Sequence, residues 1–285
     1  MTPVPPPLPA IILDPIVRLA LSEDLGRAGD LTTDATIAPD TQLSVVIAAR
    51  QNGVIAGIDV ASHALSLIDS SVKLDVQMGD GSAVKPGDVV ARLDGSARSI
   101  LTAERTMLNF IGRLSAVATM TRSYVEKISH TSATIVCTRK TTPGHRALEK
   151  RAVRCGGGTA HRYGLDDAVL IKDNHIAACD GSVALALERA KAYAGHLRMI
   201  EIEVDTLEQF EEALRYGPHA VLLDNMSPDT LRRAVAMNEG RVTLEASGGV
   251  NLDTVASIAE TGVDYISVGA LTHSAPNLDV GMDVV

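Results

Sequence analysis

The second half of the chain alternates short apolar runs with amphipathic segments. Six runs of four to six residues are rich in branched apolar side chains, as buried strands are. They cover residues 133–137, 168–171, 199–204, 220–223, 242–245 and 265–268. Amphipathic segments at 207–216, 228–239 and 252–261 predict helices between the later strands. This alternation is typical of parallel βα units, and we expect a barrel-like (β/α) domain with fewer strands than a closed eightfold barrel.

The first half has a different pattern. A helix is predicted at 14–24, and short strand-like runs such as 44–49 and 88–93 follow, separated by turn sequences. A helix at 59–68 interrupts these runs, which favours an α+β unit with a mostly antiparallel sheet. A long helix at 97–129 connects the two patterns. We therefore divide the chain into a lead-in and helix, 1–24, an α+β domain, 25–114, and a (β/α) domain, 115–285.

The composition excludes several classes of protein. A formal charge of −9 over 285 residues argues against binding to nucleic acid or to a membrane surface. No apolar run approaches the roughly 20 residues of a membrane span. The three cysteines have neither disulfide nor zinc-site spacing, which favours a reducing cytoplasm. Residues 1–7 are rich in proline and lack the basic start of a signal peptide, so we expect a flexible lead-in.

Polar residues follow each predicted parallel strand, at the strand ends where such domains carry their chemistry. They include Thr138, Arg139, Lys140, Lys172, Glu203, Asp224 and Ser247, and the small residues Gly248, Gly249, Gly269 and Ala270 lie at the ends of the last two strands. Residues 139–175 hold eight Lys and Arg against four acids, in a chain that is acidic as a whole. This local reversal favours a pocket for a small polyanion, because Arg and Lys bind carboxylates and phosphates. For 146–154, a solvated charged helix face is an equally good interpretation.

The glycines and acids among these residues allow two interpretations each. Residues 247–249 and 269–270 follow the last two strands, where backbone N–H groups commonly hold phosphate, but they also suit ordinary βα turns. Glu203 and Asp224 can accept hydrogen bonds from sugar hydroxyls, bind Mg²⁺ through water or stabilise a cationic sugar carbon. In the alternative interpretation they form salt bridges with lysines. Glu201 and Glu245 are weaker candidates for the same group of acids.

Several ordered motifs resemble the quinolinate phosphoribosyltransferase family. The motifs are SEDLGRAGDLTTDAT from Ser22, LTAERTMLNFIGRLS from Leu101, TRKTTPGHR from Thr138, GGGTAHRYGLDDAVLIKDNHI from Gly156, IEIEVDTLEQ from Ile200, LLDNMSP from Leu222, LEASGGVNL from Leu244 and TGVDYISVGALTHS from Thr261. The chain departs from the family's pattern at His145, where Leu is usual, and at Ala160, where Asn is common. The resemblance implies an N-terminal α/β sandwich and an open α/β barrel. It also implies transfer of a phosphoribosyl group from phosphoribosyl pyrophosphate (PRPP) to quinolinate, with loss of CO₂.

The resemblance also implies a role for each candidate residue. The quinolinate carboxylates would be held by Arg139, His161, Arg162 and Lys172, with Arg105 reaching in from the partner subunit of a homodimer or higher oligomer. Thr138 would also bind substrate. The catalytic set would be Lys140, Lys172, Glu203 and Asp224, with both acids facing ribose and Mg²⁺. The 5-phosphate would lie on residues 247–249 and on Gly269, Ala270 and Leu271.

Two other functions suit parts of this pattern. Lys172, at a barrel-strand end, can be the nucleophile of a Schiff-base aldolase or decarboxylase. A non-catalytic relative, such as a homologue associated with molybdenum transport, would use the same pocket only to bind. The crowding of Arg and Lys favours the transferase over the Schiff-base enzyme. The presence of Lys172 together with the paired acids favours catalysis over binding alone.

Overall fold

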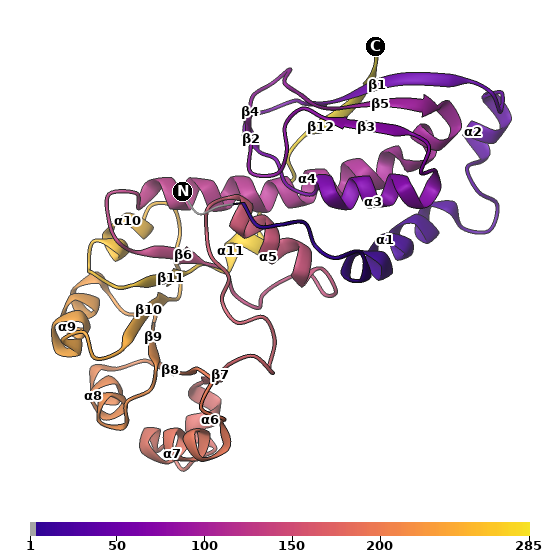
Figure 1. Cartoon of the computed structure of the whole chain (residues 1–285). Coiled ribbons are helices and arrows are strands. Elements are labelled where there is room, and N and C mark those ends of the chain that lie inside the picture. The colour runs from indigo at the N-terminus through magenta and orange to yellow at the C-terminus, as the bar shows by residue number, and fades with distance from the viewer. Residues whose placement is uncertain (1–3) are drawn as a thin grey trace. The chain divides into compact units, whose positions relative to one another are not determined.

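The strands form a four-stranded sheet, a six-stranded sheet and a separate two-stranded pair in the computed structural model, which describes residues 4–285 (Figure 1). They belong to two units. The first unit takes in the chain up to Arg122 together with Thr141–Gly157 and Leu271–Val285. The second unit consists of Ser123–Lys140 and Gly158–Ala270.

The first unit is built around an antiparallel sheet of four strands in the order β12-β1-β5-β3. These are β12 (Val280–Val284), β1 (Gln42–Ala49), β5 (Val89–Ser96) and β3 (Lys73–Val76), with a separate pair formed by β2 (Gly53–Val54) and β4 (Ala83–Val84). Its helices are α1 (Ala10–Leu25), α2 (Leu31–Thr36), α3 (Ile58–Ile68), α5 (Arg146–Cys155) and most of α4 (Ala97–Lys127). Helices α3 and α4 cover one face of the sheet (Figure 1). The predicted antiparallel character is therefore confirmed.

The second unit is a parallel sheet of six strands in the order β6-β11-β10-β9-β8-β7. The strands are β6 (Thr134–Val136), β7 (Val169–Ile171), β8 (Ile200–Val204), β9 (Ala220–Asp224), β10 (Thr243–Ser247) and β11 (Tyr265–Ser267). The helices are α6 (Asp173–Ala177), α7 (Val183–Tyr193), α8 (Leu207–Tyr216), α9 (Pro228–Asn238), α10 (Val255–Ala259) and the start of α11 (Ala270–His273). Strands β6 and β7 are the two edges of this sheet within the described residues, so the predicted open α/β barrel is confirmed.

Local sequence explains where three of these helices begin and which way the side chains of β8 point. Ser182, Thr206 and Ser227 each accept a hydrogen bond from a backbone N–H in the first turn of the helix that follows. Side chains alternate along β8, so its isoleucines are buried on one face while Glu201 and Glu203 share the other. The alternation thus places two acids of one strand on the same side of the sheet.

The division into units differs from the predicted boundary at residue 114. The predicted second domain, 115–285, includes Leu271–Val285, but β12 in this segment pairs with β1 of the first unit. Helix α5 likewise lies in the first unit, where Lys150 and Arg151 are buried. The interpretation of 146–154 as a solvated charged face is therefore wrong.

The proline-rich start is anchored, contrary to the prediction of a flexible lead-in. Arg151 Nε donates a hydrogen bond to the Pro6 carbonyl at 3.0 Å, and the Leu8 N–H donates to Asp59 Oδ2 at 3.2 Å. Residues 1–3 of that prediction lie outside the described residues. Within residues 4–285, the structure has no helix with the length and apolar character of a membrane span.

Candidate functional site

A cavity of about 420 Å³ lies at the carboxyl ends of the strands of the second unit. Its lining combines cationic, acidic and hydroxyl side chains with two leucines. The lining residues are Thr138, Arg139, Lys140, His161, Arg162, Leu170, Lys172, Glu203, Leu222, Asp224, Glu245, Ser247 and Ser267. Because the carboxyl ends of parallel strands meet at one edge, residues more than a hundred positions apart reach the same space.

One part of the cavity pairs a lysine with acids. Lys172 follows β7, and its Nζ lies 3.0 Å from Glu203 Oε2 on the neighbouring strand β8. Asp224 ends β9, the next strand, and its pKa is raised by burial and by the charge of Asp205, an effect that Lys172 and Lys140 oppose. The lysines here can neutralise the charge of a phosphate, and the carboxylates can accept hydrogen bonds from hydroxyl groups.

A second part brings two guanidinium groups close together. The pKa of Arg162 is lowered by burial and by the positive charge of Arg139. Arg162 Nη1 donates to the Ala168 carbonyl at 3.3 Å, whereas the buried Arg162 Nε has no hydrogen-bond partner within residues 4–285. Two positive charges that lie close together and are partly desolvated repel each other. They therefore favour the binding of an anion with two negatively charged groups.

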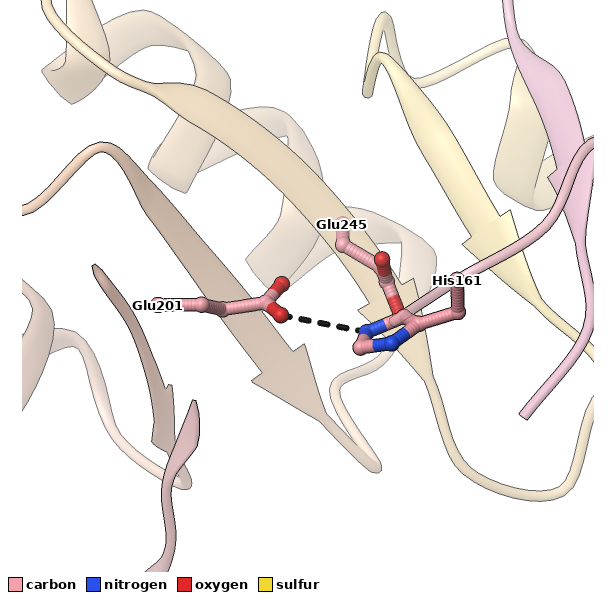
Figure 2. Close-up of side chains that lie close together, drawn as sticks. All are labelled: His161, Glu201 and Glu245. Carbon is pink, nitrogen blue, oxygen red and sulfur yellow. Dashed lines mark ion pairs between the residues drawn. The ribbon is translucent and has the colours of Figure 1, made fainter. Parts of the chain in front are cut away.

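His161 faces two acids on separate strands, as Figure 2 shows. Its Nε2 lies 3.1 Å from Glu201 Oε2 on β8 and 3.6 Å from Glu245 Oε1 on β10. Its Nδ1 accepts a hydrogen bond from the Arg162 backbone N–H at 2.7 Å. An acceptor role at Nδ1 places the imidazole proton on Nε2, from which it points toward the carboxylates.

Glu245 is the most deeply buried acid of this cavity, with 5% of its surface exposed. Burial raises its pKa to about 7, and the charge of Glu201 adds to the effect, while His161 and the Ser267 hydroxyl oppose it. One ligand atom each from His161, Glu201 and Glu245 lies within 4.8 Å of the others, which is the spacing of a metal site. The proton on Nε2 is nearer to Glu201, and Glu245 Oε1 has no hydrogen-bond partner within residues 4–285.

Nine of the predicted site residues line this cavity, and six do not. The nine are Thr138, Arg139, Lys140, His161, Arg162, Lys172, Glu203, Asp224 and Ser247; the six are Arg105, Gly248, Gly249, Gly269, Ala270 and Leu271. Arg105 is exposed on α4 in the first unit. Leu271 is fully buried there and offers no side-chain surface to a ligand.

Sequence reasoning missed two polar members of the site. Ser267 ends β11, and the alternation of side chains along β11 and β10 could have indicated it together with Glu245 and Ser247. Asn225 has a left-handed backbone with φ of 52° and donates from its side-chain amide to Asp224 Oδ2 at 2.6 Å. An Asn directly after a strand that ends in Asp is the available signal for this contact.

Comparison with known proteins shows the family. Two family models, described as the N-terminal and C-terminal domains of quinolinate phosphoribosyl transferase, match residues 30–115 and 117–283. The chain belongs to the quinolinate phosphoribosyltransferase family. The resemblance seen in the sequence motifs is thereby confirmed.

Individual relatives of this family match along nearly the whole chain. The nicotinate-nucleotide pyrophosphorylase [carboxylating] of Mycobacterium leprae is 45% identical over 276 residues, covering 94% of this chain and 95% of the relative. Quinolinate phosphoribosyltransferase [decarboxylating] 1b of Nicotiana tabacum is 40% identical over 298 residues, covering 98% and 84%. The crystal structure of NadC from Streptococcus pyogenes superposes with a TM-score of 0.94 at 40% identity, covering 99% and 100%.

Proposed function

We propose that the protein is a quinolinate phosphoribosyltransferase of de novo NAD biosynthesis. It joins quinolinate to 5-phosphoribosyl 1-pyrophosphate and releases nicotinate mononucleotide, CO₂ and pyrophosphate. The observation that carries the proposal is a single cavity with two guanidinium groups in one part and a lysine–carboxylate group in another. The names of the family's members support the same reaction.

The guanidinium part suits a pyridine dicarboxylate. Arg139 and Arg162 offer planar donor pairs that match carboxylate oxygens, and Thr138, His161 and Lys172 complete this part of the cavity. Leu170 and Leu222 supply apolar surface for a flat ring. Arg105, exposed on α4, would reach the site of a partner subunit, so that a homodimer or a higher oligomer would complete each cavity.

The lysine–carboxylate part suits the sugar donor. Lys140 would neutralise the leaving pyrophosphate, while Glu203 and Asp224 would accept the ribose hydroxyls and stabilise positive charge at the sugar carbon. The 5-phosphate would bind at 247–249 and 269–271, where backbone N–H groups follow the last two strands. The ring nitrogen attacks the sugar carbon, and no protein nucleophile is needed. Catalysis then consists of holding two anions in line and balancing their charge.

Mg²⁺ fits the donor set at this part of the cavity. Glu203 and Asp224 supply hard carboxylate oxygens, and the raised pKa of Asp224 identifies a carboxyl whose charge the protein leaves incompletely compensated. We therefore assign the ion to these two residues through water. When bound, Mg²⁺ would neutralise pyrophosphate oxygens, while the residues themselves position the ribose.

The cell compartment is part of the proposal. Three free cysteines support a cytoplasmic enzyme that acts on small molecules, and the net charge of −9 supports the absence of a nucleic acid or membrane partner.

The test is a product assay on the purified chain with quinolinate, PRPP and Mg²⁺. We expect nicotinate mononucleotide, CO₂ and pyrophosphate in equal amounts, and we expect Arg139→Ala to abolish turnover while its circular dichroism stays that of the wild type. Binding of quinolinate without products would indicate a binding protein. Trapping of a carbonyl substrate on Lys172 by borohydride would indicate a Schiff-base enzyme; the ion pair of Lys172 with Glu203 already disfavours that chemistry.

A further inference from the structure

The reaction proposed above requires a proton inside the cavity. Loss of CO₂ leaves an electron pair on the ring carbon next to the alkylated nitrogen, and that carbon must gain one proton to give the product. We propose that Glu245 is the catalytic acid that supplies this proton. The inference rests on the proposed function and adds a residue to it.

The position of Glu245 suits a proton donor. It lies on β10 and lines the cavity, and only 5% of its surface is exposed. Its Oε1 is fully buried and has no hydrogen-bond partner within residues 4–285. A carboxylate oxygen left without a donor in such a place disfavours the charged form, so the carboxylic acid form gains weight.

The groups around Glu245 also favour the protonated acid. Glu201 and Glu203 on β8 bring negative charge, while His161 and the Ser267 hydroxyl on β11 oppose them, and Arg139, Lys140, Arg162 and Lys172 line the same cavity. On β9, the residue in register with Glu245 is the uncharged Leu222. The His161 N–H lies closer to Glu201, at 3.1 Å, than to Glu245, at 3.6 Å. With its pKa raised to about 7, Glu245 holds a proton in part of the molecules at neutral pH and releases it readily, as a general acid must.

The acid lies in the part of the cavity where the diacid would be bound. The His161 ring lies between Glu245 and Arg162, with its Nε2 3.6 Å from Glu245 Oε1 and its Nδ1 accepting from the Arg162 backbone N–H. The charge of Glu201 also acts on the Arg162 guanidinium. Asp224, the other carboxyl with a raised pKa, belongs to the lysine–carboxylate part and is assigned to ribose. Glu245 is therefore the acid placed beside the carboxylates of the ring.

The step balances without another reactant. The bond between the ring carbon and its carboxylate carbon breaks, CO₂ leaves, and the electron pair stays on the ring carbon, stabilised by the adjacent cationic nitrogen. The proton moves from the Glu245 oxygen to this carbon and forms the C–H bond of the product. Glu245 becomes a carboxylate and takes a proton from water once the product has left.

The experiment compares release of pyrophosphate with release of CO₂ in Glu245→Gln, whose amide keeps the size and neutrality of the acid but cannot donate a proton in this way. We expect CO₂ to fall about ten-fold or more below pyrophosphate, with quinolinate mononucleotide accumulating, because the unprotonated intermediate recaptures CO₂. Glu245→Asp should restore part of the CO₂ release. Glu188→Gln is the matched control, since Glu188 is exposed on α7 of the same unit and does not line the cavity; its two products should stay equal.

Equal release of CO₂ and pyrophosphate by Glu245→Gln, even at a reduced rate, would overturn the role. The wild type gives an independent readout if that variant does not fold. Its ratio of CO₂ to pyrophosphate should fall as the pH rises above about 7, where Glu245 loses its proton, and a ratio of one up to pH 9 would overturn the role as well. A wild type that releases neither product refutes the proposed function itself, which is a different result.

Discussion

The side-chain amide of Asn225 donates a hydrogen bond to Asp224 Oδ2 at 2.6 Å. Asn225 holds this position through a left-handed backbone and through its own N–H, which donates to the Ser247 carbonyl at 2.9 Å. Gly248 packs directly against it, and a Cβ atom at Gly248 would overlap the Asn225 amide. Three consecutive contacts thus fix the carboxylate of Asp224 before any substrate binds.

We therefore predict that Gly248→Ala impairs catalysis much more than Gly249→Ala. Both glycines have positive φ, so both variants carry a backbone cost of about 1–2 kcal/mol, but an added Cβ at Gly249 meets no atom within 4 Å. Displacement of Asn225 should lower kcat by about ten-fold or more in the Gly248 variant alone. Steady-state kinetics with both substrates provides the measurement. Similar kcat values for the two variants would contradict the role of Asn225.

Removal of one guanidinium should weaken quinolinate binding selectively. Arg162→Ala is expected to raise the KM for quinolinate about 10- to 100-fold, because a charge-assisted hydrogen bond contributes roughly 1.5–3 kcal/mol, and to leave the KM for PRPP nearly unchanged. Arg232→Ala, on exposed α9, is the control for loss of a positive charge in the same unit. Equal increases in both KM values would show that Arg162 acts on the fold and not on the diacid.

The ionisation of Glu245 should make the protein less stable as the pH rises. Its folded pKa is about 7 and its unfolded value 4.5, so between these values the folded state binds more protons than the unfolded state. The neutral acid contributes fully to the free energy of unfolding below pH 4.5. This contribution, on the order of a few kcal/mol, is lost as the pH rises through 7. Urea unfolding at pH 5, 6, 7 and 8 should show a decline that Glu245→Gln lacks. Parallel curves for the two proteins would contradict the raised pKa.

In the first unit, the buried charge of Arg151 should be important for stability. Arg151 is 8% exposed and pairs with Asp80 and Asp59, the latter at 3.4 Å, while also holding the Pro6 carbonyl. Arg151→Ala leaves two acids without their cation, which costs about 3 kcal/mol or more, whereas Arg154→Ala on the same helix should cost far less. Denaturant unfolding measures both. Equal losses would mean that helix propensity, and not the buried pairs, determines the effect.

The sequence predicts much of the second unit because its signals are local. Each parallel strand is a short apolar run, and polar residues at strand ends come together by topology alone, which is how Lys172, Glu203 and Asp224 could be grouped in advance. The contacts of His161 depend instead on the path of residues 158–168 between α5 and β7, which no periodicity encodes. The return of β12 to the first sheet is set by pairing with β1, more than 230 residues earlier in the chain. The burial of Arg151 likewise depends on acids distant in sequence.

The most direct test of the account is a crystal structure of the protein with quinolinate. We expect the two carboxylates to lie on the guanidinium groups of Arg139 and Arg162, with the ring between Leu170 and Leu222 and the carboxylate nearest the ring nitrogen beside Glu245. A structure in which quinolinate binds away from both arginines, with an occupancy that rises with the quinolinate concentration, would contradict the assignment of this cavity.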